Sequence, residues 1–325
     1  PLAAAYGEPA PEGLDYPAFV KPVKAAFSVL ARTVASREEL QRHTRFGAWE
    51  LWVIRHLVEP FERIAAQRLP EAGTAHSLMT EAVVDAPQYC LDGYVQGGQM
   101  HLLGCVDIQM YPGTESFMRF DYPTRLPADV VARAAEVARR FLAEVGFTHG
   151  MFNMEFFHDP ATDRITVIEF NPRLASQFSD LYQRVRGLDP HAMSLALALG
   201  QDPALLPRSA PQAGAAASLV YRAFTPGGAP AMPSAATQAA LRQRFADSLL
   251  FMYPKSGHSL QRDFKWLGNH RYGILHLQGR DEAHLRQRAE EASALLGWPA
   301  PYAECLGMAP SSAEPATQPY FASGD

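Results

Sequence analysis

Two neighbouring segments near the middle of the chain each carry a glutamate and an asparagine two positions apart. Their sequences are FNMEFF and ITVIEFNPR. The linker HDPATDR is rich in turn-forming residues, so the two segments are predicted to be paired strands. If the turn is centred near Thr162, Glu155 lies opposite Glu169. The same register places Asn153 opposite Asn171. Because side chains alternate along a strand with a period of two, all four then share one face of the hairpin.

Two carboxylates held side by side repel each other, and they are tolerated when a hard divalent cation lies between them. Oxygen ligands of this kind suit magnesium that is bound together with substrate phosphates. The hairpin therefore predicts a magnesium site on this face. The alternative is an edge hairpin with two solvated glutamates.

The pattern N-x-E-F-F followed by I-E-F-N-P-R resembles the magnesium-binding strands of the ATP-grasp superfamily. The resemblance implies an enzyme that uses ATP to activate a carboxylate as an acyl phosphate and joins it to an amine, a thiol or another nucleophile. It implies Glu155, Glu169 and Asn171 as ligands of Mg²⁺ (or Mn²⁺). It also implies that Arg173 faces the transferring phosphate or the carboxylate substrate.

The same resemblance extends to the strand-like run YPAFVKP, which ends in Lys21. In the family, a lysine at such a strand end contacts the ATP phosphates, and the loop that follows cradles them. The resemblance thus implies contacts from Lys21, Lys24 and Ser28, although this loop carries alanines where many relatives have glycines. The alternative for Lys21 is a strand-end lysine that reaches the surface.

The segment EAVVDAPQYCLDG is similar to the hinge between ATP-grasp subdomains. The resemblance implies that Glu81, Ala82 and Val83 line the adenine. Gln88 stands where many relatives carry a glutamate that binds ribose, and an amide oxygen can also accept a hydrogen bond from a hydroxyl. The alternative for Glu81 is a solvated strand end.

For the other candidate residues, the sequence gives weaker support for a functional role. Arg119 lies between Phe117 and Phe120 in a proline-rich stretch, which is either an active-site loop with Arg119 as a catalytic side chain or a connector. His258, Lys265, His270 and Arg271 are expected in loops, either at a substrate pocket or at the surface. Trp49 and Trp52 are expected in the hydrophobic core, with contact to a cofactor as the alternative.

Several elements can be predicted from local signals. A capping box at Ser36 and Glu39 predicts a helix start, and turns are expected at Asp92-Gly93 and Gly97-Gly98. Asp189 followed by Pro190 predicts another helix start. The predicted helices cover residues 46–69 with an interruption at position 60, 129–146, 235–245 and a final stretch near the C-terminus; strands are expected at 218–224 and 249–253.

The predicted fold class is α+β (α/β), with the ATP-grasp arrangement of two subdomains whose antiparallel sheets grip ATP, and a C-terminal α+β subdomain. The expected divisions are a leader or remnant of a missing N-terminal domain (1–15), the small subdomain (16–83), the large subdomain with the metal site (84–210), the C-terminal subdomain (211–310) and a disordered tail (311–325). Relatives usually begin with a Rossmann-like domain of roughly 100 residues, so the chain is expected to be a fragment or a processed product.

Composition narrows the function classes. A net charge of −5 and no run of Lys or Arg argue against nucleic-acid binding. No apolar segment is long enough for a membrane span and the N-terminus lacks a signal peptide, so a cytoplasmic location is expected. The three cysteines lack metal-ligand spacing.

The expected partners are ATP, a small-molecule carboxylate and a small-molecule nucleophile, with a second copy of the chain or a separate N-terminal domain as protein partners. Carboxylate-amine ligation is the leading hypothesis for the function. A biotin carboxylase-like subunit and a non-catalytic ATP-binding domain remain as alternatives.

Overall fold

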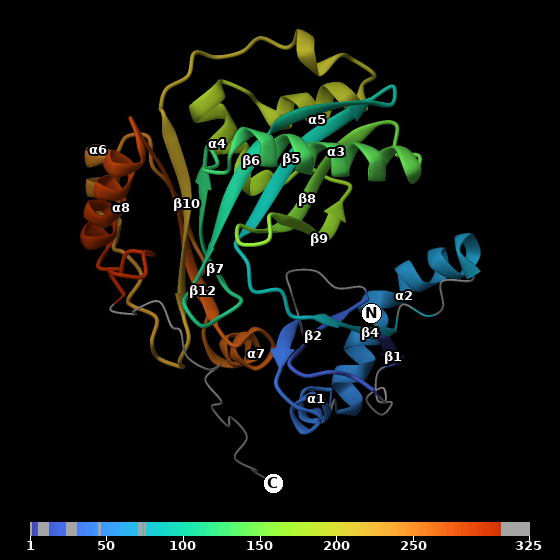
Figure 1. Ribbon diagram of the computed structural model, residues 1–325. Helices are drawn as coiled ribbons and strands as arrows, with labels where there is room; N and C mark the ends of the chain where they lie inside the picture. The colour runs from blue at the N-terminus through green and yellow to red at the C-terminus, as the bar shows by residue number, and fades with distance from the viewer. Residues whose placement is uncertain are drawn as a thin grey trace. The chain divides into compact units, whose positions relative to one another are not determined.

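The computed structural model describes residues 2–5, 13–23, 31–44, 47–70, 74 and 76–306. The chain divides into two compact units, one made of residues 1–85 and 256–270 and the other of residues 86–255 and 271–325 (Figure 1). Lys24, Ser28 and the tail at 311–325 lie outside the described residues.

The smaller unit is built on a four-stranded antiparallel sheet in the order β1-β4-β2-β3. Its strands are β1 (Leu2–Ala5), β2 (Ala18–Pro22), β3 (Arg32–Val34) and β4 (Ser77–Ala82). Its helices are α1 (Arg37–His43), α2 (Ala48–Arg68) and α7 (Gly257–Leu267). Val20, Leu40 and Leu78 are among the side chains of its hydrophobic core.

The predicted capping box at the start of α1 is confirmed. The Ser36 hydroxyl accepts a hydrogen bond from the Glu39 backbone N–H (3.2 Å), and the Glu39 carboxylate accepts one from the Ala35 backbone N–H (2.8 Å). These contacts satisfy two N–H groups at the helix start that have no partner within the helix.

The predictions for the following helix are partly wrong. α2 continues through Pro60 instead of being interrupted there. Trp49 and Trp52 are 68% and 56% exposed, because the helix packs on the core through Leu51 and Ile54 instead. Aromatic content alone does not identify the buried side of a helix.

Residues 257–267, which were expected to be loop, form α7. His258 and Lys265 therefore lie on a helix, and His270 and Arg271 begin the next strand. His270 is buried and its Nδ1 lies 3.3 Å from Asp263 Oδ2, so a contact across the end of α7 holds this helix in place. His270 lies seven residues after Asp263, so a contact between them could not be recognised as a local helix signal in the sequence.

The larger unit is built on an eight-stranded sheet in the order β11-β12-β10-β7-β6-β5-β8-β9. Its strands are β5 (Gln88–Gln96), β6 (Gln99–Met110), β7 (Phe117–Tyr122), β8 (Gly150–Asp159), β9 (Arg164–Asn171), β10 (Ala215–Ala223), β11 (Leu249–Met252) and β12 (His270–Gly279). The strands β10, β12 and β11 extend the sheet from β7, so the segments on either side of residue 210 share one sheet.

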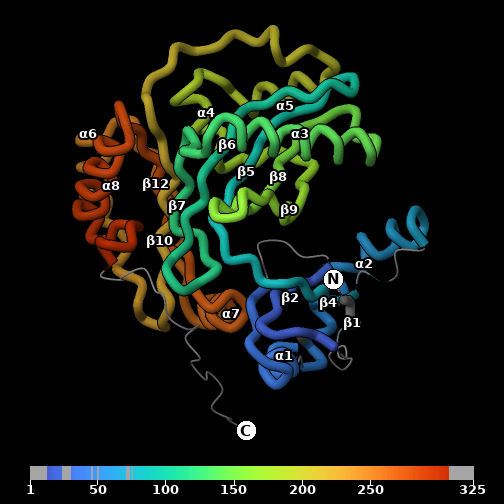
Figure 2. Tube along the Cα trace, in the orientation of Figure 1, coloured from blue at the N-terminus to red at the C-terminus, as the bar shows by residue number. Residues whose placement is uncertain are grey.

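Helices cover both faces of this sheet. They are α3 (Ala128–Glu144), α4 (Ser176–Arg186), α5 (Pro190–Ala198), α6 (Ala235–Arg244) and α8 (Glu282–Leu296), with a short 3-10 helix η2 (Pro203–Leu205). Figures 1 and 2 show α3 in front of β5 and β6, with α4 and α5 behind them. Leu91, Met154 and Phe156 form a core with α3, whereas Ile108 and Phe120 form a core with α4.

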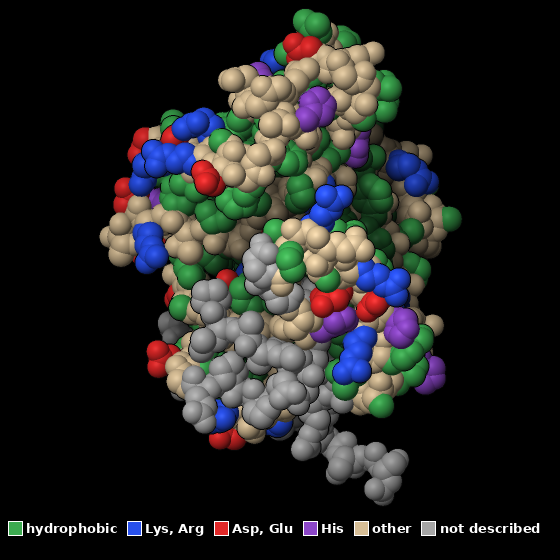
Figure 3. Space-filling view, turned by 90° about the vertical axis from the view of Figure 1, so that its right-hand side faces the viewer, with side chains coloured by type: hydrophobic (Ala, Val, Ile, Leu, Met, Phe, Trp, Pro, Cys, Tyr) green, Lys and Arg blue, Asp and Glu red, His purple; other side chains and the backbone are tan. Residues whose placement is uncertain are grey.

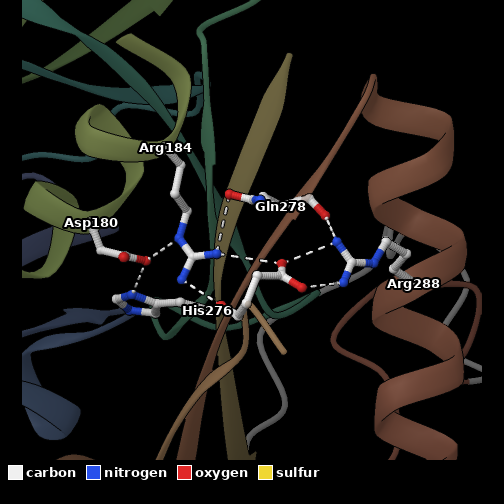
Figure 4. Close-up of polar contacts among 6 residues, drawn as sticks. Asp180, Arg184, His276, Gln278 and Arg288 are labelled. Carbon is white, nitrogen blue, oxygen red and sulfur yellow. Dashed lines mark hydrogen bonds and ion pairs between the residues drawn. The ribbon is translucent and has the colours of Figure 1, made fainter. Parts of the chain in front are cut away.

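A polar network ties α4 to the β10–β12 end of the sheet (Figure 4). Arg184 Nε donates to Asp180 Oδ2 (2.6 Å), and His276 Nδ1 lies 3.0 Å from the same oxygen. Arg184 Nη2 also donates to the backbone carbonyl of Asp247 (2.7 Å), and the carboxylate of Asp247 pairs with Arg288 of α8. Opposite charges thus alternate across three elements that are far apart in the sequence.

No described helix has the length and apolar character that a membrane-spanning helix needs. On the face drawn in Figure 3, basic, acidic and hydrophobic side chains are interspersed. This mixture agrees with the small net charge of the chain.

Two glycines with the same backbone conformation offer a matched test of packing. Gly187 ends α4 with φ +66°, and a Cβ there would lie 1.8 Å from the Ser209 carbonyl oxygen; Gly200 has φ +72° with no atom within 4 Å. Gly187→Ala is expected to lower the free energy of unfolding clearly more than Gly200→Ala, whose strain alone costs about 1–3 kcal/mol. Urea unfolding of both variants measures the difference. Equal losses of unfolding free energy would show that the Ser209 segment moves away from the added methyl group.

Candidate functional site

The predicted register of the central hairpin is confirmed. Asn153 pairs with Asn171 and Glu155 with Glu169, in antiparallel strands β8 and β9. A bulge follows Glu155 and shifts the remaining pairs by one residue. The side chains of these two pairs therefore share one face, which is also the face of Gln88 in the adjacent strand β5.

Amide groups hold one oxygen of each glutamate in place. Gln88 Nε2 donates to Glu155 Oε2 (2.9 Å), and Asn171 Nδ2 donates to Glu169 Oε1 (2.8 Å). Asn171 Nδ2 also donates to Asn153 Oδ1 (3.3 Å). The second oxygen of each carboxylate is left as an acceptor, together with the amide oxygen of Asn171.

The cluster continues inward to an acidic residue of β5. Asn153 Nδ2 donates to Asp92 Oδ1 (3.1 Å), and the hydroxyl of Tyr182 in α4 donates to Asp92 Oδ2 (2.7 Å). Asp92 is only 2% exposed. Both carboxylate oxygens of this buried group therefore have donors, as the burial of an acid requires.

Burial and like charge shift the pKa values of two acids in the cluster. Burial raises the pKa of Glu155 to about 7, and the adjacent Glu169 carboxylate acts in the same direction, while the Arg173 guanidinium opposes the shift. Burial also raises the pKa of Asp92 to about 7, against the hydrogen bond from Tyr182. Negative charge is thus disfavoured here unless a cation compensates it.

The donor set fits a hard cation. Two carboxylates and one amide oxygen on a single face are the ligands that Mg²⁺ accepts alongside phosphate oxygens. Within the described ranges, no three His, Cys, Asp or Glu side chains come together to hold a metal. A cation bound on this face would therefore take Glu155, Glu169 and the amide oxygen of Asn171 as its protein ligands.

The smaller unit carries four of the residues that were predicted to contact ATP, which are Lys21, Glu81, Ala82 and Val83. Lys21 of β2 and Glu81 of β4 form an ion pair, with Nζ and Oε2 2.8 Å apart. Ala82 ends β4, and Val83 follows it as an exposed residue. Lys21, next to the last residue of β2, is thus held by an acidic neighbour rather than extended alone into solvent.

Arg119 is not brought to the cluster. Its neighbour Phe120 packs on Phe178 of α4, so Arg119 points to the opposite face of the sheet. There its Nε pairs with Asp121 Oδ2 (2.8 Å), and its guanidinium lies 4.3 Å from the centre of the Tyr302 ring. These contacts place Arg119 on the face of the sheet opposite Glu155 and Glu169.

Asp92 and Tyr182 belong to the cluster although no sequence pattern predicted them there. Asp92-Gly93 was predicted as a turn, but β5 runs through it with a bulge. A Cβ at Gly93 would lie 2.5 Å from the His101 carbonyl oxygen and 2.7 Å from the Phe152 ring, so the glycine is needed for close approach. The signal that was available is an acidic residue inside an otherwise apolar strand.

Comparison with known proteins gives a family and several related folds. The model of the ATP-grasp domain matches residues 14–180, which is more than half of the chain. Carnosine synthase 1 of Gallus gallus is 37% identical over 91 residues, which cover 28% of this chain and 10% of that protein.

Two solved structures show a similar fold at low identity. The L-amino acid ligase of Bacillus licheniformis has a TM-score of 0.57 and 15% identity, over 87% of this chain and 62% of that one. Biotin carboxylase of Campylobacter jejuni, solved as a beta-gamma-ATP complex, has a TM-score of 0.54 and 15% identity, over 87% and 58%. The chain thus spans about three fifths of these proteins and a tenth of the carnosine synthase.

The α+β fold with a large antiparallel sheet agrees with these neighbours. The match to the domain model also includes the paired glutamates of β8 and β9 and Lys21 of β2. The chain belongs to the ATP-grasp family.

Proposed function

We propose that this protein is an ATP-dependent ligase that activates a carboxylate as an acyl phosphate and joins it to an amine. The observation that carries the proposal is the convergence of Glu155, Glu169 and Asn171 on one face of the β8–β9 hairpin. Such an oxygen cluster matches the needs of a divalent cation that is bound with nucleotide phosphates.

In this proposal Glu155, Glu169 and Asn171 would hold Mg²⁺, which would neutralise charge on the phosphate oxygens. Arg173 stabilises the oxygens of the transferring phosphoryl group, which carry the charge in the transition state. A carboxylate oxygen of the substrate attacks the γ-phosphorus and ADP leaves. The amine nitrogen then attacks the acyl carbon, the bond between that carbon and the phosphate oxygen breaks, inorganic phosphate leaves and the nitrogen loses a proton.

The nucleotide contacts are proposed from the family pattern. Lys21 is assigned to the ATP phosphates, with Lys24 and Ser28 of the following loop. Glu81, Ala82 and Val83 are assigned to the adenine. Gln88 is assigned to the ribose, and its hydrogen bond to Glu155 supports a place near the metal ligands.

The names of two similar proteins favour an amine as the nucleophile. One is an L-amino acid ligase and the other a carnosine synthase. We therefore propose amino acids or similar small amines as the first class of substrates to test.

The experiment is a screen for ADP release from Mg²⁺-ATP with pairs of carboxylates and amines. ADP release that requires both a carboxylate and an amine supports the proposal. Release that requires bicarbonate and free biotin would instead identify a biotin carboxylase-like subunit. ATP binding without ADP release under every condition would identify a non-catalytic nucleotide-binding domain.

The raised pKa of Glu155 predicts a pH dependence of metal binding. With a pKa of about 7, the carboxyl group is largely protonated at pH 6 and largely ionised at pH 8, and only the ionised form binds a cation. As the pH is raised toward 7, the affinity for Mn²⁺ is therefore expected to increase about tenfold for each pH unit. Above pH 8 the affinity is expected to level off. Mn²⁺ titration by water-proton relaxation measures this, and a constant affinity between pH 6 and 8 would contradict it.

A further inference from the structure

A chain of hydrogen bonds with a fixed direction runs from the interior of the larger unit to the proposed metal ligands. It starts at Asp92 of β5, passes through Asn153 of β8 and ends at Asn171 of β9. These residues are neighbours across three strands, because Asp92 pairs with Asn153 and Asn153 with Asn171. Only Asn171 belongs to the proposed ligand set.

The direction of this chain follows from the chemistry of its first member. Both oxygens of Asp92 accept hydrogen bonds, Oδ2 from the Tyr182 hydroxyl and Oδ1 from Asn153, so Asn153 turns its Nδ2 toward Asp92. Its Oδ1 then faces Asn171, which must turn its Nδ2 toward Asn153. An asparagine has one donor group and one acceptor group, and its partners decide which way each of them points.

The direction decides what Asn171 can offer to a cation. Its two N–H bonds are used by Asn153 Oδ1 and Glu169 Oε1. The polar atom that remains is Oδ1, which is an oxygen ligand. If the chain were reversed, Asn171 would present N–H groups, and these repel a metal ion.

We infer that Asp92 and Asn153 are positioning residues that fix Asn171 with its oxygen toward the divalent cation. This inference rests on the proposed function, since it assigns a role around the same metal ligands. Partners that orient a metal ligand commonly change metal affinity by 10–100-fold when they are replaced.

The test is the affinity for Mn²⁺ alone, measured on the full chain by water-proton relaxation. Asp92→Asn is expected to weaken binding about tenfold. The Tyr182 hydroxyl then donates to the new amide oxygen, so the new N–H group faces Asn153 and the chain reverses.

The exchange Asp92→Asn with Asn153→Asp provides the decisive comparison. The carboxylate at position 153 again accepts from Asn171, the amide at position 92 donates to it, and the net charge is unchanged. Binding is expected to return to within about threefold of the original protein. A role of Asp92 in stability alone would not be rescued in this way.

Asp107→Asn is the matched control. Asp107 is as buried as Asp92 and lies on the neighbouring strand β6, but its side chain binds Thr124 and Arg125 on the other face of the sheet. This variant is expected to keep the Mn²⁺ affinity whatever it costs in stability. If Asp92→Asn does not fold, Asn153→Ala removes the acceptor for Asn171 and should show the same tenfold loss.

The outcomes separate the two proposals. If Mn²⁺ does not bind saturably to the unaltered chain, both the proposed metal site and the positioning role are refuted. If the unaltered chain binds Mn²⁺ but Asp92→Asn binds it equally well, or the exchange variant stays as weak as Asp92→Asn, the positioning role alone is refuted.

Discussion

Glu169→Gln is expected to lower the rate of ADP release by about 10³-fold or more, because the phosphoryl transfer loses a ligand of its charge-neutralising cation. Glu169 lies opposite Glu155 and shares its face of the hairpin. An amide of the same size keeps the hydrogen bond with Asn171 possible but removes the negative charge. The loss should therefore appear in kcat and in the metal dependence, with little change in unfolding.

Glu136→Gln is the control for this experiment. It makes the same chemical change on α3, where Glu136 pairs at the surface with Arg139 and Arg140. Exposed pairs of this kind contribute little to stability, so activity should stay within about twofold of the original value. Full ADP release by Glu169→Gln would overturn the assignment of the metal site.

Arg184→Met is expected to lower the free energy of unfolding of the larger unit by about 3 kcal/mol or more. Arg184 is buried and donates to Asp180 and to the backbone of Asp247 (Figure 4). Methionine fills much of the space but leaves the carboxylate of Asp180 with His276 as its remaining partner in the network. Removing one member of a buried charge network costs more than the network contributes, because the other charges stay buried.

Urea unfolding followed by circular dichroism measures this effect, taken from the transition of the larger unit because the two units can unfold separately. Arg140→Met is the matched control, since Arg140 is exposed on α3 and pairs with a surface glutamate. Its cost should stay below about 0.5 kcal/mol. A cost below about 1 kcal/mol for Arg184→Met would mean that water enters and replaces the guanidinium.

Local sequence signals predicted the parts of the structure that depend on near neighbours. The capping box of α1 and the start of α5 at Asp189 involve residues within four positions of each other. The hairpin register of Glu155 with Glu169 follows from a turn of a few residues between two alternating strands. In each case the partner is fixed by the length of chain between the residues.

Contacts between distant segments could not be predicted in the same way. Arg119 was expected near the substrate, yet the strand order and the alternation along β7 turn it toward Tyr302 on the other face. The helix α7 was not predicted, and its buried Asp263 contacts His270, which lies beyond the end of the helix. Propensity is a weak guide where such tertiary contacts decide the conformation.

The sequence by itself determined that two carboxylates and two amides share one face of a hairpin, because strand geometry repeats every two residues and the turn sets the register. Only the tertiary structure decided that Asp92, from a strand more than 60 residues away, lies beneath them. The reason is that strand order in a sheet is a property of the whole chain, and no spacing within a single segment encodes which strand becomes its neighbour. The acceptor at the start of the hydrogen-bond chain was therefore visible only in the folded protein.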